Sequence, residues 1–474
     1  MNFQSLLGGW KRYDRWLLWL GLPLLAVALH WQVWDMELRG MHVWRQTQTQ
    51  QAIDGFGKED FNILNPRRLE RGDGDGILRL EFPLYQWTTA ALGKLFGHSI
   101  LLSRLMVFLL SFLAAIGMHR LVNTITESRG AAFMGAFFLM FSPLIFFYGV
   151  SVMPDMMALC ASIWGLYFCI ASMREFSWGK FAIAAALIGL GTLIKLPFIV
   201  FEAAFIPLLL RGFSKKHEQK PLGSLKMILV LNLGLLPAFA WYAWVMPSWG
   251  PAGIESELLF HPEEWPVLKE ILIYHFWQVI PRTTTSILSL PFIVIGLFVL
   301  FRKAKLGSSL KQMLWPIAAL GLGFFCFWLY ALGIIGIPHD YYFLPLVPVF
   351  ATVAAIGAWQ GFKRLPKWAL SILVVLILAT PYMAYRRVAI RWSPEKAEFN
   401  RDLYFHQEAL QNAVPNADLV VAGPDLSHMV FLYYIDKKGW SWDKNQGLSV
   451  EKIKDWKSRG AKYLYCDDRA YDTD

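Results

Sequence analysis

The sequence carries little charge for its length. Only 17% of its 474 residues are Asp, Glu, Lys or Arg, whereas a soluble domain usually carries about 25%. The shortage is uneven, because charged residues are nearly absent from a series of apolar runs and gather between them. The net charge of +10 lies mostly in these short connections. It therefore does not indicate a nucleic-acid partner.

Cysteine is equally scarce, which argues against whole classes of site. The four cysteines form no Cys-x-x-Cys pair, and three of them lie in apolar runs. A disulfide framework and a structural zinc site are therefore not predicted. The glycine-rich segment with Asp73 and Asp75 lacks the spacing and the terminal glutamate of an EF-hand, so we interpret it as a flexible turn. We predict no metal ligands and no organic cofactor, and leave only a divalent cation open.

Apolar runs of bilayer length and aromatic residues are what the sequence has in abundance. A helix needs about 17–25 mainly apolar residues to cross a membrane, and Trp and Tyr favour the two interfaces. The runs predict eleven transmembrane helices at about 15–33, 99–121, 131–149, 154–173, 180–194, 196–211, 227–246, 286–301, 313–332, 342–360 and 368–385. The fifth and sixth of these meet at Lys195-Leu196-Pro197, which is either a tight hairpin or the break in one long helix.

Basic residues give the orientation of these spans. With the N-terminus inside, all six segments on the inner side are rich in Lys and Arg, as the positive-inside rule requires. An odd number of spans then places the C-terminus outside. Arg386, Arg387 and Arg391 run against this assignment, because they follow the last span on the outer side.

The fold class predicted is an all-α polytopic membrane protein with interfacial helices and a small C-terminal α/β domain. The membrane domain is residues 1–391, with a first outer loop at 34–97, and the α/β domain is residues 392–474. The first loop holds two expected helices, Met41–Phe56 and Glu81–Gly97, the second lying at the outer interface. A second long outer segment is Pro247–Ser286. In the C-terminal domain, helices at 403–413, 427–435 and 450–459 and strands at 419–422 and 463–466 indicate a βαβ unit.

Polar side chains gather at the start of the first outer loop. In a helix over Met41–Phe56, His42, Arg45, Gln46 and Thr49 share one face. That face is either solvated or a site that orients hydroxyls and phosphate oxygens. The same loop contains further candidates, namely Asp35, Gln48, Arg79, Glu81 and Tyr85.

Other candidates lie at the outer ends of later spans. Asp155 follows a proline at the start of the fourth span and can be an ordinary helix cap. Lys195 is flanked by long apolar runs, where a bare ammonium needs an anion. His339, Asp340 and Tyr341 precede the tenth span. The position of any one of these residues can be explained by a side chain that extends from the apolar layer to water. Their convergence on the outer side of the membrane, however, suits a reaction between a lipid-borne phosphate ester and an outside acceptor.

The order of these motifs resembles the C-superfamily of membrane glycosyltransferases, in particular bacterial relatives of the protein O-mannosyltransferases and of the lipid A aminoarabinose transferase. The resemblance covers about residues 10–390. The matching pieces are His42-Val43-Trp44-Arg45-Gln46-Thr47-Gln48-Thr49, Glu81-Phe82-Pro83-Leu84-Tyr85, Ala91-Leu92-Gly93-Lys94-Leu95-Phe96-Gly97, Pro154-Asp155, Thr192-Leu193-Ile194-Lys195-Leu196-Pro197 and His339-Asp340-Tyr341-Tyr342-Phe343-Leu344-Pro345.

The resemblance implies inverting transfer of a hexosyl or pentosyl unit from a polyprenyl-phosphate donor at the outer face. The acceptor would be a lipid, a glycan or a protein. It further implies a multi-pass protein of the bacterial inner membrane, active in cell-envelope glycosylation, with the active site and C-terminus in the periplasm. A lipid-linked oligosaccharide ligase or polymerase and a transporter are the alternatives. Transporters commonly show inverted repeats, and none is evident here.

Two departures from the family pattern affect the candidate residues. Arg45-Gln46 replaces the acidic pair of the mannosyltransferases, and Phe82 stands where the aminoarabinose transferase has a phosphate-binding lysine, whereas Lys195 matches its second lysine. We predict Asp155 as the base, followed by Glu81 and then by His42 or Asp35. The residues predicted to bind substrate or phosphate are Lys195, Arg45, Gln46, Gln48, Tyr85, Arg79, His339, Asp340 and Tyr341.

Overall fold

A computed structural model describes residues 16–213, 221–249, 264–301, 308–393, 399–445 and 447–467. The chain divides into two compact units. The helical unit falls within Met1–Gln32, Val107–Val150 and Asp155–Val388. The mixed unit falls within Val33–Met106, Ser151–Pro154 and Ala389–Asp474. The predicted fold class, mainly helical with a small α/β part, is confirmed.

Within the described ranges, six helices are long and apolar enough to cross a membrane. The helices Trp265–Thr284 and Ile287–Phe301 are bent by 81° relative to each other. If the two together cross the membrane once, they make a seventh span. Shorter apolar helices occupy Leu17–Leu29, Arg129–Met140 and Trp178–Ile194. Every run predicted to span is at least partly helical. The six long helices are Ile100–Thr126, Asp155–Arg174, Gly223–Trp249, Gln312–Tyr330, Asp340–Arg364 and Lys367–Trp392.

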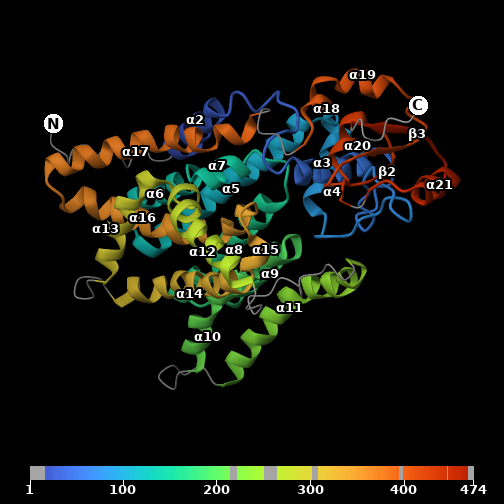
Figure 1. Ribbon diagram of the computed structural model, residues 1–474. Helices are drawn as coiled ribbons and strands as arrows, with labels where there is room; N and C mark the ends of the chain where they lie inside the picture. The colour runs from blue at the N-terminus through green and yellow to red at the C-terminus, as the bar shows by residue number, and fades with distance from the viewer. Residues whose placement is uncertain are drawn as a thin grey trace. The chain divides into compact units, whose positions relative to one another are not determined.

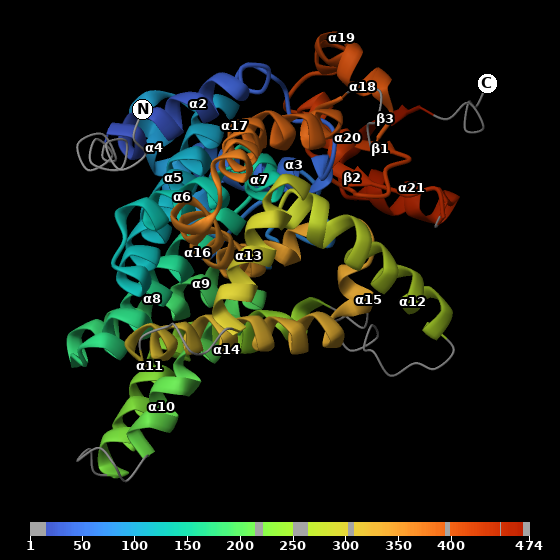
Figure 2. The same ribbon diagram turned by 90° about the vertical axis from the view of Figure 1, so that its left-hand side faces the viewer.

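Burial separates the central helices of the helical unit from the peripheral ones. Over their most apolar 18 residues, 78% of the residues are buried in helix α8 (Asp155–Arg174) and in the span that contains α16 (Val347–Arg364). The corresponding share is 22% in the span of α17 (Lys367–Val388). Leu378 of α17 is 73% exposed. Such an apolar surface suits contact with lipid chains rather than water. Figure 2 shows α8, α9 and α16 within this unit.

Close packing between helices of this unit depends on small residues. Helix α9 (Trp178–Ile194) approaches α11 (Pro221–Val245) so closely that a Cβ on Gly189 would lie 2.0 Å from the Gly234 carbonyl oxygen. A Cβ on Gly357 of α16 would lie 1.8 Å from the carbonyl oxygen of Phe292 in α13 (Leu290–Phe301). Small residues allow such approach where van der Waals packing holds helices together.

The chain reverses direction at Lys195, so the hairpin alternative is confirmed. Helix α9 ends at Ile194, Lys195 is extended, and the 3-10 helix η2 (Leu196–Phe205) begins at once. The rings of Phe181, near the start of α9, and Phe205, at the end of η2, lie 5.3 Å apart. The reversal sets Lys195 at the end of the two helical segments, which is what positions its ammonium.

The mixed unit contains a parallel three-stranded sheet in the order β2-β1-β3. Strand β1 (Leu419–Gly423) pairs on one side with β2 (Gly439–Ser441) and on the other with β3 (Ala461–Cys466). Helix α20 (Val430–Ile435) connects β1 to β2, and α21 (Val450–Ser458) connects β2 to β3. The expected βαβ connection is present, and β2 was missed because three residues give no periodicity to detect.

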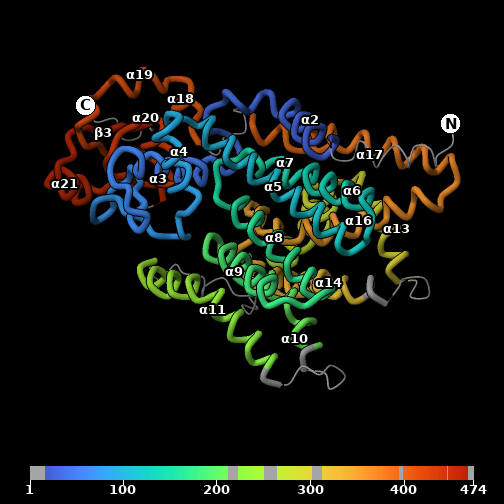
Figure 3. The backbone as a smooth tube through the Cα atoms, turned by 180° about the vertical axis from the view of Figure 1, so that it is seen from behind, coloured from blue at the N-terminus to red at the C-terminus, as the bar shows by residue number. Residues whose placement is uncertain are grey.

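The first outer loop packs against this C-terminal sheet within the mixed unit. Gln51 of helix α3 (Val43–Lys58) donates to the Met429 carbonyl at 2.9 Å and accepts from the Leu69 amide at 3.0 Å. Trp440 of β2 donates to the Gly72 carbonyl at 2.9 Å. Figure 1 and Figure 3 show α3 and α4 (Leu84–Phe96) beside the strands and α20. The compact units therefore group loop 34–97 with the C-terminal piece, whereas the predicted division at residue 391 groups it with the membrane helices.

Several predicted boundaries differ from the structure. Helix α4 begins at Leu84, so Glu81 precedes it. The span predicted at 131–149 is broken into α6 (Arg129–Met140) and α7 (Pro143–Tyr148), because Pro143 cannot continue the first helix. Residues 265–284, predicted to be outer loop, form α12 (Trp265–Tyr274) and η6 (His275–Thr284). The predicted helix over 403–413 is two short helices, α18 (Arg401–Phe405) and α19 (Gln407–Asn412).

Candidate functional site

The predicted site residues that the structure brings together form two clusters, one in each unit. The carboxylate–lysine cluster of the helical unit consists of Asp155, Lys195, Tyr148, Asp340 and Tyr341. The arginine pocket of the mixed unit contains Arg45, Gln48 and Glu81, together with residues that the sequence did not single out.

An ion pair lies at the centre of the carboxylate–lysine cluster. The Nζ of Lys195 is 3.5 Å from Oδ1 of Asp155, and the two side chains are only 6% and 2% exposed. Asp155 is the first residue of α8, and Lys195 directly follows the last residue of α9, so antiparallel helices bring them to the same end. Both were predicted as site residues from separate spans, and the structure brings them together.

Aromatic side chains and a second carboxylate complete this cluster. The Lys195 ammonium is 4.9 Å from the ring centroid of Tyr341, within range of a cation–π contact. Tyr341 packs edge-on against Tyr148, and the Tyr148 hydroxyl donates to Oδ1 of Asp340 at 2.5 Å. Tyr148, Asp340 and Tyr341 are all buried. Nothing in the sequence around Tyr148 distinguished it from the other aromatic residues.

A backbone turn holds Lys195 in place. Its amide donates to the Gly191 carbonyl at 2.9 Å and its carbonyl accepts from Phe198 at 3.0 Å. The Tyr242 hydroxyl of α11 accepts from the Leu196 amide at 3.1 Å. The lysine main chain is thus fixed on both sides, so the ammonium is positioned rather than mobile on a loop.

The chemistry available to this cluster is the binding of an anion beside a carboxylate. A buried ammonium can hold phosphate oxygens, and the aromatic ring beside it can stabilise the cation when its partner changes. Oδ1 of Asp155 faces the lysine, whereas Oδ2 accepts no hydrogen bond from the described part of the chain. That oxygen can accept a proton from an incoming hydroxyl.

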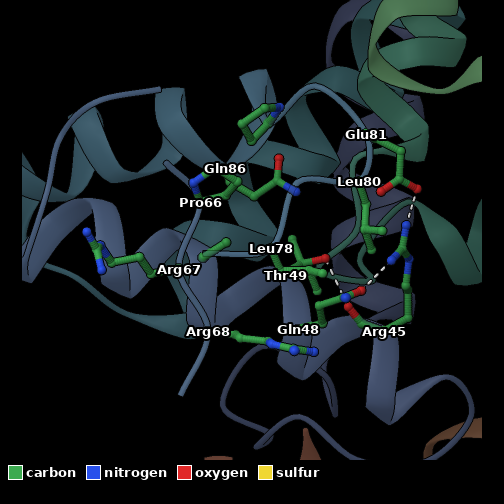
Figure 4. A pocket seen from close by; sticks show the side chains of 12 residues that line it. Arg45, Gln48, Thr49, Pro66, Arg67, Arg68, Leu78, Leu80, Glu81 and Gln86 are labelled. Carbon is green, nitrogen blue, oxygen red and sulfur yellow. Dashed lines mark hydrogen bonds and ion pairs between the residues drawn. The ribbon is translucent and has the colours of Figure 1, made fainter. Parts of the chain in front are cut away.

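The arginine pocket lies along α3 in the mixed unit (Figure 4). The Arg45 guanidinium bonds to Glu81 and to the Gln48 side-chain oxygen, and its side chain is 9% exposed against 15% for Glu81. Arg67 and Arg68 line the same pocket. Arg45 and Thr49 are buried, so the alternative of a solvated α3 face is wrong.

Gln86 is a lining residue of this pocket that the sequence analysis missed. It lies on α4, is 8% exposed, and its side-chain oxygen accepts no hydrogen bond from the described residues. It follows Tyr85 directly, but one residue along a helix turns the side chain by about 100°. Tyr85 is 0% exposed and its hydroxyl donates to the Ser103 carbonyl at 2.9 Å. Tyr85 therefore lies in the core of the unit and Gln86 in the pocket.

The other predicted residues of the first outer loop have local partners or lie apart. Gln46 donates to the Met41 carbonyl and accepts from the Val152 amide, each at 3.2 Å. Arg79 donates to the Leu64 carbonyl at 2.8 Å and to Asn65 at 2.9 Å. The Arg79 contacts stabilise the loop itself, and the Gln46 contact with Val152 joins it to the Ser151–Pro154 segment of the same unit.

Three further predicted residues differ in their exposure. His42 is 1% exposed and adopts a left-handed conformation just before α3. Asp35 is exposed. In the helical unit, His339 packs against Tyr341, with ring centroids 5.6 Å apart, and its Nδ1 is 2.9 Å from the Ile334 carbonyl oxygen.

The described ranges hold no group of three or more His, Cys, Asp or Glu side chains placed to bind a metal ion. The segment with Asp73 and Asp75 is a turn stabilised by protein contacts. Loss of hydration is the largest single influence on the Asp75 carboxyl and raises its pKa. The hydrogen bonds from Arg67, at 2.8 Å, and from the Ile77 amide outweigh it, so the pKa is lowered. Trp440 and Arg459 both donate to the Gly72 carbonyl.

Comparison with known proteins identifies the fold. Residues 81–244 match the sequence model of the family described as dolichyl-phosphate-mannose-protein mannosyltransferase. No curated protein sequence matches the chain. ArnT from Cupriavidus metallidurans in the apo state is 14% identical, with a TM-score of 0.61 over 91% of this chain and 88% of ArnT. ArnT bound to undecaprenyl phosphate gives 14% identity and a TM-score of 0.58 over 94% and 90% of the two chains.

An archaeal protein shares the same fold. The oligosaccharyltransferase AglB from Archaeoglobus fulgidus, in complex with an inhibitory peptide and a dolichol-phosphate, is 14% identical. Its TM-score is 0.57, over 92% of this chain and 65% of AglB. The predicted resemblance to the C-superfamily of membrane glycosyltransferases is confirmed, and the protein is an integral multi-pass membrane protein with this fold.

Proposed function

We propose that the protein is an inverting glycosyltransferase that moves a hexosyl or pentosyl unit from a polyprenyl-phosphate donor to an acceptor at the outer face of the membrane. The observation that carries the proposal is the buried ion pair of Asp155 and Lys195. A charged pair at the ends of apolar helices is costly to bury, so such a pair is retained for a function or is compensated by excellent geometry. An ammonium that exchanges its carboxylate partner for a phosphate has such a function.

The roles follow from the bonds that change. The acceptor oxygen attacks the anomeric carbon, the bond from that carbon to the phosphate oxygen breaks, and the hydroxyl proton passes to a carboxylate. The leaving phosphate is a weak base, so it requires a cation rather than a general acid. Lys195 binds that phosphate, and Asp155 takes the proton through Oδ2.

Glu81 is the second candidate for the base. Its Oε1 is bonded to Arg45, and the side chain is 15% exposed in the arginine pocket. His42 and Asp35 rank behind it, since His42 is buried in the loop and Asp35 is exposed to solvent. A divalent cation is not part of the proposed chemistry, because the ammonium supplies the positive charge that the phosphate needs.

The similar structures support the class of donor. ArnT was solved with undecaprenyl phosphate and AglB with a dolichol-phosphate, and both share this fold. The family matched at residues 81–244 is named for a dolichyl-phosphate-mannose donor, and this range includes Asp155 and Lys195. A lipid-linked oligosaccharide ligase would use the same phosphate-binding cluster with a larger donor. We further propose the bacterial inner membrane, with both the cluster and the C-terminus in the periplasm.

One experiment separates an enzyme from a transporter. The purified protein is incubated in detergent micelles with a panel of labelled polyprenyl-phosphate sugars, with water or an added oligosaccharide supplying the acceptor hydroxyl, and release of polyprenyl phosphate is measured. We expect release from at least one donor, and we expect Lys195→Ala to raise the KM for that donor while Lys195→Arg retains part of the affinity. Retention of every donor intact, with movement of the label across a reconstituted membrane, would favour the transporter instead.

A further inference from the structure

A second pocket lies in the mixed unit, away from the arginine pocket. It has a volume of about 630 Å³, in the range usual for small-molecule sites. Its lining includes Pro424, Asp425 and Leu426, which follow β1, and Asp467, which follows β3. Because β1 and β3 are parallel neighbours, these residues meet at the carboxyl edge of the sheet. Open sheets of this type bind ligands outside the carboxyl ends of their strands.

Aromatic rings form part of the wall of this pocket. Trp44 of α3 and Phe399 both line it. One face of the Phe399 ring stacks on Tyr434, with centroids 4.9 Å apart, so the orientation of the ring is fixed. Both residues also pack against the hydrophobic core of the mixed unit. A rigid aromatic wall suits a ligand with a flat apolar face.

Polar groups at the rim define the charge of the ligand. Asn400 donates to the Asp467 carboxylate at 2.8 Å. The Asp425 carboxylate accepts from Ser427 and from the Phe431 amide at 2.8 Å, so it is held by its own loop. Among the described lining residues there are two aspartates and no Lys, Arg or His. The pocket therefore repels anions and offers acceptors to neutral hydroxyl groups.

We propose that this pocket binds a neutral sugar ring of a glycan acceptor. A sugar ring combines an apolar C–H face, which can stack on Trp44, with a hydroxyl edge that can donate to Asp467. The assignment rests on the proposed function, because it names the acceptor class of that reaction. Trp44 precedes Arg45 on α3, and the Arg45 guanidinium carbon lies 5.8 Å from the Trp44 ring centroid. One helix thus connects the sugar-binding pocket to the arginine pocket.

Binding is measured on the full-length protein in detergent micelles, without any polyprenyl-phosphate donor. The probes are neutral oligosaccharides, the same oligosaccharides carrying carboxylates, and linear peptides. We expect a neutral oligosaccharide to bind and its carboxylate form to bind about tenfold or more weakly, since tenfold corresponds to one unfavourable charge contact. Trp44→Ala should weaken neutral binding about tenfold, as loss of an aromatic anchor does.

Two further variants protect the test against misfolding. Asp467→Asn alters an exposed side chain and should raise the affinity for the carboxylate-bearing oligosaccharides. Tyr463→Ala removes an aromatic residue that is 43% exposed on β3 outside the pocket, and it should change nothing. Thermal unfolding curves of each variant accompany the binding data.

The outcomes distinguish this inference from the proposed function. One outcome supports the pocket and contradicts the transferase. In it, oligosaccharides bind and Trp44→Ala weakens that binding about tenfold, but the protein releases sugar from no donor. Sugar transfer whose acceptor KM is the same in Trp44→Ala and wild type overturns the pocket and leaves the transferase standing. The inference is also overturned if peptides bind in preference to neutral oligosaccharides, or if Asp467→Asn leaves anionic binding unchanged.

Discussion

Replacing Asp155 by asparagine tests the assignment of the carboxylate–lysine cluster most directly. The substitution keeps the shape of the side chain and removes its charge. Charges 3.5 Å apart attract by about 5 kcal/mol at an effective dielectric constant of about 20, before the cost of burying them is subtracted. Removal of one partner from a buried pair destabilises a protein by about 3–5 kcal/mol. We therefore expect a clear fall in melting temperature.

The kinetic effect of Asp155→Asn depends on the role of the carboxylate. If Asp155 is the base, kcat falls by a factor of about 10²–10⁴. If Asp155 is only the counter-ion of Lys195, the freed ammonium binds donor phosphate more tightly, so the donor KM falls and kcat is retained. We expect the first result. The two roles therefore move different kinetic constants, and kcat is referred to the folded fraction of the variant so that the change in stability does not enter it.

The assay is release of polyprenyl phosphate from a labelled donor, measured below the melting temperature of the variant. Glu202→Gln is the matched control, because Glu202 is a half-buried acid in η2 of the same unit and outside the cluster. It should keep wild-type kcat and KM. Wild-type turnover by Asp155→Asn would refute its assignment as the base.

Three other outcomes can be tested on the mixed unit. Glu81→Gln should lower turnover about tenfold or more if Glu81 is the base. The control Glu59→Gln, which removes a partly exposed surface ion pair, should keep wild-type turnover. Turnover by Glu81→Gln equal to that of Glu59→Gln would exclude Glu81 as the base. Gly439→Ala should lower the unfolding free energy by about 1–3 kcal/mol, because its Cβ would lie 1.8 Å from a carbonyl oxygen of β1, and Gly74→Ala, with open space around it, should be neutral. Burial raises the pKa of the Asp54 carboxyl in the folded state. The protonated carboxyl therefore stabilises the fold fully below about pH 4, and this stability is lost as the pH rises through the raised pKa. Asp54→Asn should therefore raise the melting temperature at neutral pH and have little effect below about pH 4, and a gain of the same size at both pH values would contradict this reasoning.

Positions of the membrane helices could be predicted because bilayer thickness sets a length and a composition that a single sequence displays. All eleven apolar runs are helical in at least part of their length. Breaks inside runs were less predictable. Pro143 marked the interruption between α6 and α7, but the helical segment at 265–284 has the aromatic and acidic content of a loop. Composition alone does not separate a bent, partly buried helix from an exposed connection.

Site residues were predictable where a charge stood out against apolar surroundings. Lys195 and Asp155 were found in this way, because an isolated charge at the end of a span needs a partner. Tyr148 and Gln86 were missed, since a tyrosine among phenylalanines and a glutamine on an amphipathic helix carry no local signal. Tyr85 was a candidate among the polar residues of the first outer loop, yet its hydroxyl is bonded inside the core. Tyr85 lies in the core and Gln86 in the pocket because they lie on different faces of α4.

The sequence by itself determined that the chain crosses a membrane, where its helices lie, and that ionisable groups gather at the ends of those helices. These properties are local, since they depend on hydrophobicity over about 20 residues. Only the tertiary structure decided which charges form pairs, that Gln51 and Trp440 join the first outer loop to the C-terminal sheet, and that Trp44 and Asp467 line one pocket. Residues hundreds of positions apart meet only when the chain folds, because side-chain contacts extend over a few ångströms.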